Sequence, residues 1–356
     1  MHPLSGRDLA EHLDLVDEIL EGMFTVSVER AGRRSVAFRE LWEQLRRNAQ
    51  GGKRIRPRLV LASYHALGGT DTRGAASAAA AFELLHTALV VHDDVIDRDF
   101  VRRGIPNVSG SYRDKAHTAG MALPIAEHRG MGAAVIAGDL ALAGSYQLMR
   151  SASDDPAIAI RLQQLLDDAI FESAAGELID LDFSIQPERI APVEDILDME
   201  RLKTAVYSFE APLQAGALLA GAGADVVAAL GVFGTHIGIA YQVVDDVLGI
   251  YGDSETTGKP VIGDLREGKH TVVIGFAAQH AEWHDVKSGF GSPDLDEAGA
   301  ARLRADLERI GARRQAEDIA LWHADEARSV LNGPLIPADL RDHLVPLVVD
   351  AVERIK

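Results

Sequence analysis

Apolar residues recur at intervals of three and four along almost the whole chain, which is the pattern of amphipathic and buried helices. The spacing predicts helices over 9–23, 37–49, 56–67, 72–97, 131–149, 156–183, 193–222, 224–252, 270–281, 294–311, 312–331 and 337–355. Pro212 lies inside one of these stretches and predicts a kink there. Convincing strand-like alternation is missing. We therefore expect an all-α protein of roughly a dozen helices, folded as a single domain over residues 1–356.

Two segments break the helical pattern. Residues 103–130 mix Gly, Pro and Ser with one short amphipathic piece, and residues 252–269 are rich in Gly and charged residues. Long irregular loops in compact domains are usually functional or disordered. We expect these two segments to be loops that are either functional or disordered.

The composition narrows the classes of function. The net charge is -18 and no run is rich in Lys and Arg, which argues against nucleic acid as a partner. The absence of cysteine excludes disulfides, thiolate nucleophiles and cysteine-based zinc sites. Every apolar stretch of about 18 residues is broken by charge, Gly or Pro, so we expect no integral membrane segment. The polar, acidic N-terminus is unlike a signal peptide, and we expect a cytoplasmic protein.

Acidic residues are concentrated where two apolar helices are predicted to end. The segment "VVHDDVID" at 90–97 is matched by "QVVDDVLG" at 242–249. Asp93 and Asp97 are four residues apart and share one helix face, where two carboxylates repel unless a cation lies between them. Mg²⁺ suits such oxygen ligands and is usually held by one or two carboxylates together with substrate phosphates. If Asp245 faces the first pair from the second helix, the acids enclose a site for several Mg²⁺ ions and a diphosphate.

The alternative interpretation is a pair of solvated acidic helix ends. Acids are disfavoured at a helix C-terminus by the helix dipole, so two such clusters favour a compensating site. Basic residues that could grip phosphate accompany both clusters. They are Lys53 and Arg56 in "GGKRIRP", Arg102 and Arg103 in "RRG", and Lys203, Lys259 and Lys269 in the second half of the chain.

Taken together and in order, these motifs resemble those of the trans-isoprenyl diphosphate synthases, the polyprenyl synthetase family. The motifs are "GGKRIRP", "ELLHTALVVHDDVID", "RRG", "AGD", "LKT", "YQVVDDVLG" and "GKPVIGDLREGKHT", and they span residues 51–271. The resemblance implies a helical bundle around a central cavity. It also implies Mg²⁺-dependent head-to-tail condensation of isopentenyl diphosphate with an allylic diphosphate to an all-trans product.

Residue by residue, the resemblance implies three Mg²⁺ ions, held by Asp93, Asp97 and Asp245 with support from Asp94 and Asp246. It implies contacts to the allylic diphosphate from Arg102, Lys203 and Lys259. It implies contacts to isopentenyl diphosphate from Lys53, Arg56, His86 and Arg103. Thr204 and Gln242 are expected to line the developing allylic cation. The released diphosphate is expected to take the proton, so that no side-chain base is needed. A homodimer is also expected.

Two departures from the family pattern stand out. The second acidic motif ends in Gly249, where most members have a third aspartate, and Asp253 one turn further on is a candidate replacement. This form occurs in some geranylgeranyl diphosphate synthases, so we do not interpret it as inactivating. The connection at about 108–130 between "RRG" and "AGD" is longer than usual, which suggests a surface lobe or a dimer contact.

Product length is expected to depend on the residues four, five and eight before Asp93, namely Leu89, Ala88 and Leu85. In short-product members bulky aromatic residues near the position of Ala88 block the product tunnel. Ala88 leaves space, which favours the C20 product geranylgeranyl diphosphate, with C15 and C25 or longer as alternatives. Ala88 could instead be a helix-packing residue with no contact to the product.

Three other kinds of protein share parts of this pattern. A class I terpene cyclase has the fold and the first acidic motif, but usually has an Asn/Ser/Glu metal motif on the second helix and lacks "GGKRIRP". An HD-type phosphohydrolase could be suggested by His92-Asp93, but needs further spaced His and Asp ligands that we do not find. A non-catalytic subunit of a heteromeric synthase generally loses acids from its motifs, whereas Gly249 alone departs here.

Overall fold

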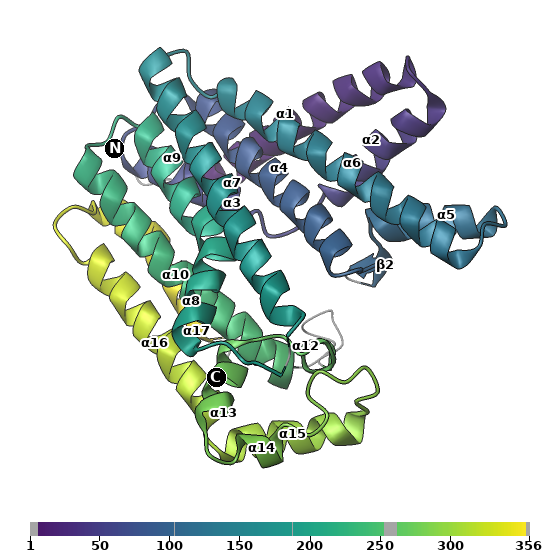
Figure 1. The fold of residues 1–356 in the computed structure, drawn as a ribbon. Helices are drawn as coiled ribbons and strands as arrows, with labels where there is room; N and C mark the ends of the chain where they lie inside the picture. The colour runs from purple at the N-terminus through teal and green to yellow at the C-terminus, as the bar shows by residue number, and fades with distance from the viewer. Residues whose placement is uncertain (1–5, 103, 187, 253–261, 354–356) are drawn as a thin grey trace. The chain divides into compact units, whose positions relative to one another are not determined.

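The computed structural model describes residues 6–102, 104–186, 188–252 and 262–353, and helices dominate these segments (Figure 1). The N-terminal elements are α1 (Gly6–Gly32), α2 (Val36–Asn48), α3 (Ile55–Ala66), α4 (Thr72–Ile96), β1 (Val101–Arg102), β2 (Ile105–Pro106), α5 (Val108–Thr118), α6 (Leu123–Arg150) and α7 (Pro156–Ser184). They are followed by α8 (Val193–Glu200), the π-helix η1 (Arg201–Glu210), α9 (Ala211–Leu219), α10 (Ala224–Tyr251), α12 (Gly263–Glu267), α13 (Val272–Gln279), α14 (Trp283–Val286), α15 (Glu297–Arg309), α16 (Ala312–Leu331) and α17 (Ala338–Glu353). The all-α prediction is confirmed, since the two strands form a small antiparallel hairpin of two residues each.

The chain divides into two compact units. Unit 1 comprises Met1–Asp168 and Ala211–Val227, and unit 2 comprises Ala169–Glu210 and Ala228–Lys356. Both α7 and α10 contribute residues to each unit, and η1 of unit 2 continues directly into α9 of unit 1. The expectation of a single domain over residues 1–356 stays a prediction.

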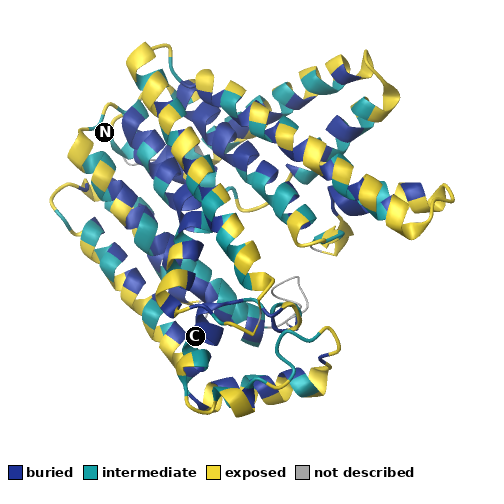
Figure 2. Cartoon of the chain, viewed as in Figure 1, coloured by how far each residue is buried: buried dark blue, intermediate teal, exposed yellow. Residues whose placement is uncertain are grey.

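Helix α4 forms the centre of unit 1, where it packs against α1, α3, α6 and α9. It begins at Asp71, whose Oδ1 accepts a hydrogen bond from the backbone N–H of Gly74 at 3.2 Å. The alanine-rich stretch that follows is buried on every face, as the dark blue colour in Figure 2 shows. Small side chains let neighbouring helices approach closely; a Cβ at Gly144 of α6 would collide with Leu84. This packing holds the acidic end of α4 on a rigid element.

The segment 103–130 was expected to be largely irregular, and this expectation was wrong. It contains α5, and α6 begins at Leu123 rather than near residue 131. Asn107 caps α5 by accepting a hydrogen bond from the backbone N–H of Gly110 at 2.8 Å. A Cβ at Gly110 would collide with the carbonyl of Phe100, and one at Gly130 with the carbonyl of Ser109. The glycines that suggested a loop are therefore sites of close packing between helical elements.

The predicted helix 193–222 consists of α8, η1 and α9. Pro212 is the second residue of α9, and the backbone change that it suggested is the ten-residue π-helix immediately before it. Glycines of neighbouring helices face η1: a Cβ at Gly176 of α7 would collide with Lys203, and one at Gly238 of α10 with Ala205. The segment "LKT" is thus held by close backbone contacts within unit 2.

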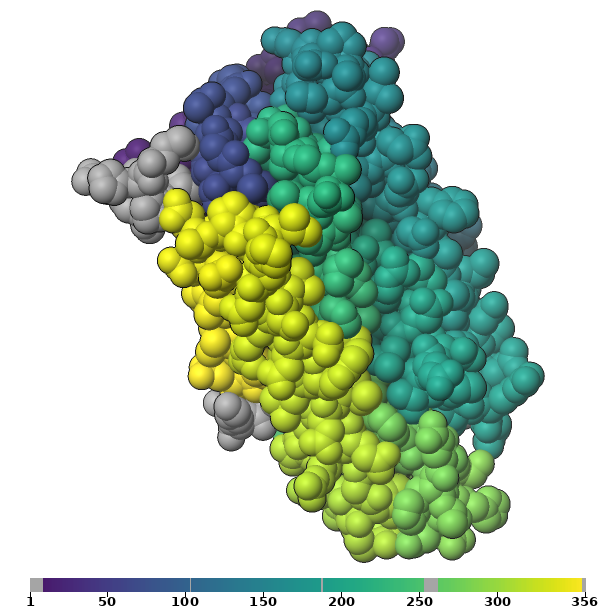
Figure 3. All heavy atoms as spheres, turned by 90° about the vertical axis from the view of Figure 1, so that its left-hand side faces the viewer, coloured from purple at the N-terminus to yellow at the C-terminus, as the bar shows by residue number. Residues whose placement is uncertain are grey.

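Unit 2 has its own hydrophobic core, built mainly from α8, α10, α13, α15 and α16. Helix α16 packs against both α13 and α17. Figure 3 shows the last helices of the chain, α16 and α17, in yellow-green to yellow, on the face of the molecule that it presents.

Within the described part of the chain, two helices, α4 and α10, are long and apolar enough to cross a membrane by length and composition. The most apolar window of α4 is 83% buried inside the protein, and that of α10 is 50% buried. Core helices of globular proteins pass the same test, and one or two such helices are weak evidence for a membrane span.

Candidate active site

The first acidic cluster lies at the end of α4, where Arg102 of β1 holds two carboxylates together. Its Nε donates a hydrogen bond to Asp94 Oδ1 at 2.8 Å, and its Nη2 donates one to Asp93 Oδ2 at 2.9 Å. Asp94 is 2% exposed, and this burial raises its pKa to about 6, although Arg102 acts in the opposite direction. Burial alone would lower the pKa of Arg102, but Asp94 and Asp93 outweigh it and the pKa is raised. The two motifs "DD" and "RRG" are therefore one electrostatic unit.

Asp97 ends α4 on the same helix face as Asp93 and is exposed to solvent. The "AGD" segment of α6 lies beside this end of α4. A Cβ at Gly138 would collide with the imidazole ring of His92, and Asp139 Oδ1 is 3.5 Å from His92 Nε2. The small residue in "AGD" thus allows α6 to pass close to the acidic end of α4.

The segment "GGKRIRP" forms a tight loop before α3. Gly51 and Gly52 have φ values of 80° and 85°, and Arg54 has φ 51°, so three residues adopt the left-handed conformation. Lys53 is exposed, and its carbonyl accepts a hydrogen bond from Arg58 Nε at 3.0 Å. Arg56 on α3 and His86 on α4 are half-buried. Three of the residues predicted for isopentenyl diphosphate thus lie on the loop before α3, on α3 and on α4, and α3 and α4 pack together in unit 1.

Sequence reasoning missed the ion pair behind this loop. Arg54 Nη1 donates a hydrogen bond to Glu83 Oε1 on α4 at 2.8 Å and to the carbonyl of Ala49 at 3.0 Å. The signal was present, because Glu83 is the one acid between Gly74 and Val91 in an otherwise apolar helix. A buried acid in such a place requires a partner.

The second acidic cluster lies towards the end of α10 in unit 2. Gln242 Nε2 donates a hydrogen bond to Asp246 Oδ1 at 3.2 Å, and the backbone N–H of Val272 donates one to Asp246 Oδ2 at 3.4 Å. Glu200, the last residue of α8, is buried and lies close enough to Asp246 for the charge of Asp246 to raise its pKa. Burial raises the pKa of Asp246 to about 7 and that of Glu200 well above its ordinary value. We therefore expect the two carboxyl groups to share one proton.

Lys203 is also held by acids. Its Nζ is 2.6 Å from Asp180 Oδ2 and 3.1 Å from Glu177 Oε2, both on α7. Thr204 follows it on η1 and is half-buried. The structure therefore places Lys203 and Thr204 of the "LKT" motif in unit 2 with Asp245, Asp246 and Gln242.

Gly249 has a neighbour that sequence reasoning did not identify. A Cβ at Gly249 would collide with the carboxylate of Asp264 in α12. Asp264 itself has Lys269 Nζ 3.9 Å away, and its charge helps to raise the pKa of Asp246. A carboxylate is thus present where the motif lacks its third aspartate. Asp253, the replacement suggested by the sequence, lies outside the described residues, as do Arg103 and Lys259.

The residues predicted to set product length lie in the interior of unit 1. Ala88 and Leu85 have no exposed surface, and Leu89 is half-buried. Buried side chains in this position fit helix packing and fit a closed tunnel wall equally well. Their role stays a prediction, as does the expectation that the acidic ends of α4 and α10 face each other.

The donor set of both clusters fits a hard divalent cation, since it consists of carboxylate oxygens on rigid helices. Within the described part of the chain, no three His, Asp or Glu side chains gather closely enough to hold a metal ion by themselves. Carboxylates in small numbers suit Mg²⁺, which keeps several waters and takes further oxygens from a substrate phosphate.

An all-α fold in which two long helices carry pairs of carboxylates at or near their ends fits a class of enzyme that binds diphosphates through divalent cations. Comparison with known proteins gives the family: the polyprenyl synthetase family model matches residues 39–292. The chain therefore belongs to the polyprenyl synthetase family, and it is a trans-isoprenyl diphosphate synthase. This assignment overturns the terpene cyclase and phosphohydrolase alternatives.

Individual proteins that are similar to this chain are also prenyl diphosphate synthases. The chain is 33% identical over 311 residues to the geranylfarnesyl diphosphate synthase of Aeropyrum pernix, covering 86% of this chain and 91% of that one. It is 30% identical over 282 residues to the geranylgeranyl diphosphate synthase of Methanosarcina mazei, covering 79% and 80% of the two chains. Its structure is similar to that of a geranylgeranyl pyrophosphate synthase from Corynebacterium glutamicum, complexed with isoprenyl diphosphate and magnesium. The TM-score is 0.89 at 27% identity, covering 98% of this chain and 99% of that one.

Proposed function

We propose that this protein condenses isopentenyl diphosphate with allylic diphosphates in the presence of Mg²⁺ and releases geranylgeranyl diphosphate. The observation that carries the proposal is that charged residues predicted for the site form ion pairs within each unit. In unit 1 Arg102 bridges Asp93 and Asp94, and in unit 2 Lys203 is held by acids of α7. The similar synthases named above support the substrate class and the C20 product.

Asp93 and Asp97 would hold two Mg²⁺ ions and Asp245 a third, because each presents carboxylate oxygens at a helix end. When bound, these ions would stabilise the negative charge of the departing diphosphate. The carboxylates of α4 are already ordered by Arg102, which lowers the reorganisation needed when the cations arrive. The number of ions is part of the proposal.

The basic residues would grip the two diphosphates. Arg102 and Lys203, with Lys259, would contact the allylic diphosphate, while Lys53, Arg56, His86 and Arg103 would hold isopentenyl diphosphate. The guanidinium of Arg102 and the ammonium group of Lys203 are already held by carboxylates. They therefore need little rearrangement when an anionic substrate binds.

Gln242 and Thr204 would face the developing allylic cation. The amide of Gln242 donates to Asp246, and this hydrogen bond fixes the direction of its carbonyl oxygen, which carries partial negative charge. The double bond of isopentenyl diphosphate attacks the cation, and the released diphosphate takes the proton. No side-chain base is required.

Chromatography of the dephosphorylated products tests the proposal directly. The purified single chain, incubated with Mg²⁺ and both substrates, should give mainly a C20 alcohol. A mainly C15 or C25 product would correct the chain length, whereas no product from the single chain would favour a non-catalytic subunit.

Ala88→Phe tests where the product tunnel runs. If the growing chain passes α4 at this level, the main product should shorten toward C15, because each helical turn of about 5.4 Å corresponds to roughly one isoprene unit. Thermal unfolding of the variant serves as the control for folding, since Ala88 is fully buried. A folded, active variant with an unchanged product distribution would contradict this placement.

We also propose a homodimer, supported by the outward surface of α7. Phe171 is 74% exposed and Leu178 59% exposed, and their spacing of seven residues puts them on one helix face. Exposed apolar side chains in such a row are typical of interaction sites. Sedimentation at micromolar concentration should give a dimer mass, and Phe171→Glu should shift it toward the monomer. A fully active monomer would contradict the dimer. The cytoplasmic location stays a prediction.

A further inference from the structure

The loop "GGKRIRP" requires an anchor because of its backbone conformation. Gly51 and Gly52 tolerate positive φ, but Arg54 carries a Cβ and has φ 51°. The left-handed region is disfavoured for such a residue and persists only when surrounding contacts fix it. The loop also carries Lys53 and leads directly to Arg56, so its conformation sets where both charged groups lie.

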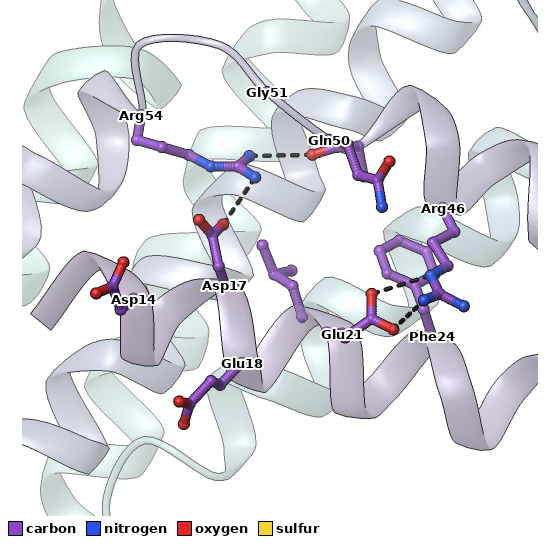
Figure 4. A pocket seen from close by; sticks show the side chains of 11 residues that line it. Asp14, Asp17, Glu18, Glu21, Phe24, Arg46, Gln50, Gly51 and Arg54 are labelled. Carbon is purple, nitrogen blue, oxygen red and sulfur yellow. Dashed lines mark hydrogen bonds and ion pairs between the residues drawn. The ribbon is translucent and has the colours of Figure 1, made fainter. Parts of the chain in front are cut away.

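The side chain of Arg54 supplies that anchor through three contacts. Nη1 donates to the carbonyl of Ala49 at 3.0 Å and to Glu83 Oε1 at 2.8 Å, while Nη2 is 2.8 Å from Asp17 Oδ1. Figure 4 shows Arg54 pointing toward Asp17 across the edge of a pocket. One guanidinium thus joins the loop to α2, α4 and α1.

The two carboxylates that contact Arg54 differ in their surroundings. Asp17 is 54% exposed and lines a pocket of about 550 Å³ between α1, α2 and the loop (Figure 4). The side chain of Glu83 is 8% exposed, and its Oε2 is buried without a hydrogen bond to any residue that the structure describes. An exposed ion pair is weak, whereas a buried carboxylate that loses its cation is strongly disfavoured. The Arg54–Glu83 pair therefore contributes more to holding the loop than the Arg54–Asp17 pair does.

Glu83 also determines where the loop lies along α4. It is three residues before His86, so the two side chains lie on the same side of the helix, about one turn apart. The ion pair consequently fixes the loop against the part of α4 that carries His86.

We propose that Arg54 and Glu83 form a positioning pair for isopentenyl diphosphate. Neither needs to contact the substrate; together they hold Lys53, Arg56 and His86 at a fixed spacing for its diphosphate. This inference rests on the proposed function, because it takes those three residues as the binding groups.

The test compares Glu83→Gln, Arg54→Gln and the double variant with the unmodified enzyme. Glu83→Gln keeps the shape and the acceptor oxygen but removes the charge. We expect the KM for isopentenyl diphosphate to rise about tenfold in each single variant, the loss of one charge-assisted hydrogen bond. The kcat and the KM for the allylic substrate should stay within twofold. The KM of the double variant for isopentenyl diphosphate should be no higher than that of the more impaired single variant, because each substitution removes the same ion pair.

Two further variants separate positioning from general stability. Asp17→Asn removes the exposed contact of Arg54 and should leave every kinetic constant within twofold. Arg54→Lys keeps the charge but not the fork, so its KM for isopentenyl diphosphate should fall between those of the unmodified enzyme and Arg54→Gln. Thermal unfolding of each variant reports folding, and the isosteric Glu83→Gln decides the matter if Arg54→Gln does not fold.

Isothermal titration of isopentenyl diphosphate keeps this inference distinct from the proposed function. An unmodified chain that binds it but forms no product contradicts the proposed function, while the dissociation constants of the variants still decide the positioning role. Three outcomes would each overturn the inference. The first is an unchanged KM and Kd in Glu83→Gln, and the second is additive effects in the double variant. The third is an equal rise in KM for both substrates. So would an unmodified chain that does not bind isopentenyl diphosphate.

Discussion

Both acidic helix ends contain the dipeptide Asp-Asp, but the negative charge of each is neutralised by different means. At the end of α4 an arginine bridges Asp93 and Asp94. Near the end of α10, Asp246 lies beside Glu200 and Asp264, and its pKa rises to about 7, compared with about 6 for Asp94. One cluster is thus balanced by a fixed positive charge, and we expect the other to be balanced by a proton shared between Asp246 and Glu200. The comparison shows that the surroundings, not the dipeptide, determine how much charge remains for a cation to neutralise.

Removing a carboxylate predicted to hold a metal ion should have the largest effect. Asp93→Ala and Asp245→Ala should each lower the rate at least ~100-fold, the low end for one preorganised electrostatic group. Steady-state assays with Mg²⁺ measure this, and Asp139→Asn on the exposed face of α6 is a matched control. Full activity in excess chelator would contradict a metal role for both clusters.

Removing the arginine of the first cluster should have the next largest effect. Arg102→Ala should raise the KM for the allylic substrate about tenfold, the value of one charge-assisted contact, whereas Arg103→Ala should mainly raise that for isopentenyl diphosphate. Arg102 lowers the pKa of Asp94, so its loss should move the pKa of that carboxyl further above about 6. The acid limb of the rate profile should therefore shift to higher pH in Arg102→Ala. Equal effects of both variants on both substrates would rule out this division of roles.

Restoring the third acid of the second motif should be unfavourable. Gly249→Asp brings a carboxylate against Asp264, and the clash and the like charge should cost about 1 kcal/mol of stability. Chemical denaturation measures this cost, and Gly249→Asp combined with Asp264→Asn should recover most of it. If the single variant is as stable as the unmodified protein, Asp264 does not occupy the place of the missing acid.

Replacing Glu200, which we expect to share a proton with Asp246, should have the smallest effect. The folded-state pKa of Asp246, about 7, is above its ordinary value of 3.8, so its contribution to stability is present at low pH and is lost as the pH rises through about 7. In Glu200→Gln an amide donates to Asp246 at every pH, which should stabilise the protein at pH 8 by about 0.5 kcal/mol, the low end for one hydrogen bond. Melting temperatures from pH 5 to 8.5 should therefore fall less in the variant. Parallel curves would show that no proton is shared.

The sequence was sufficient for the fold class, for most helices and for the family, because helical periodicity and ordered motifs are local signals. It was insufficient where glycine serves tertiary packing, so α5 and the early start of α6 were read as a loop. Arg54, Glu83, Glu200 and Asp264 were missed for a related reason. The pairs Gly249–Asp264, Arg54–Glu83 and Glu200–Asp246 are 15, 29 and 46 residues apart in the chain, and no local pattern connects them. The positions of the predicted site residues followed from motifs, but their charge balance depended on these distant partners.

The order in which α4 and its neighbours are synthesised has a consequence for the cell. Helix α4 ends at Ile96, yet α9, one of the helices that cover it, is complete only at Leu219. At 5–20 residues per second the ribosome needs roughly 6 to 25 seconds to add the 123 residues between these two points (219 − 96). Throughout that interval the nascent chain carries an incompletely covered apolar segment long enough to span a bilayer. We therefore expect this enzyme to depend on chaperones that bind nascent chains and to be produced in better yield when translation is fast relative to aggregation.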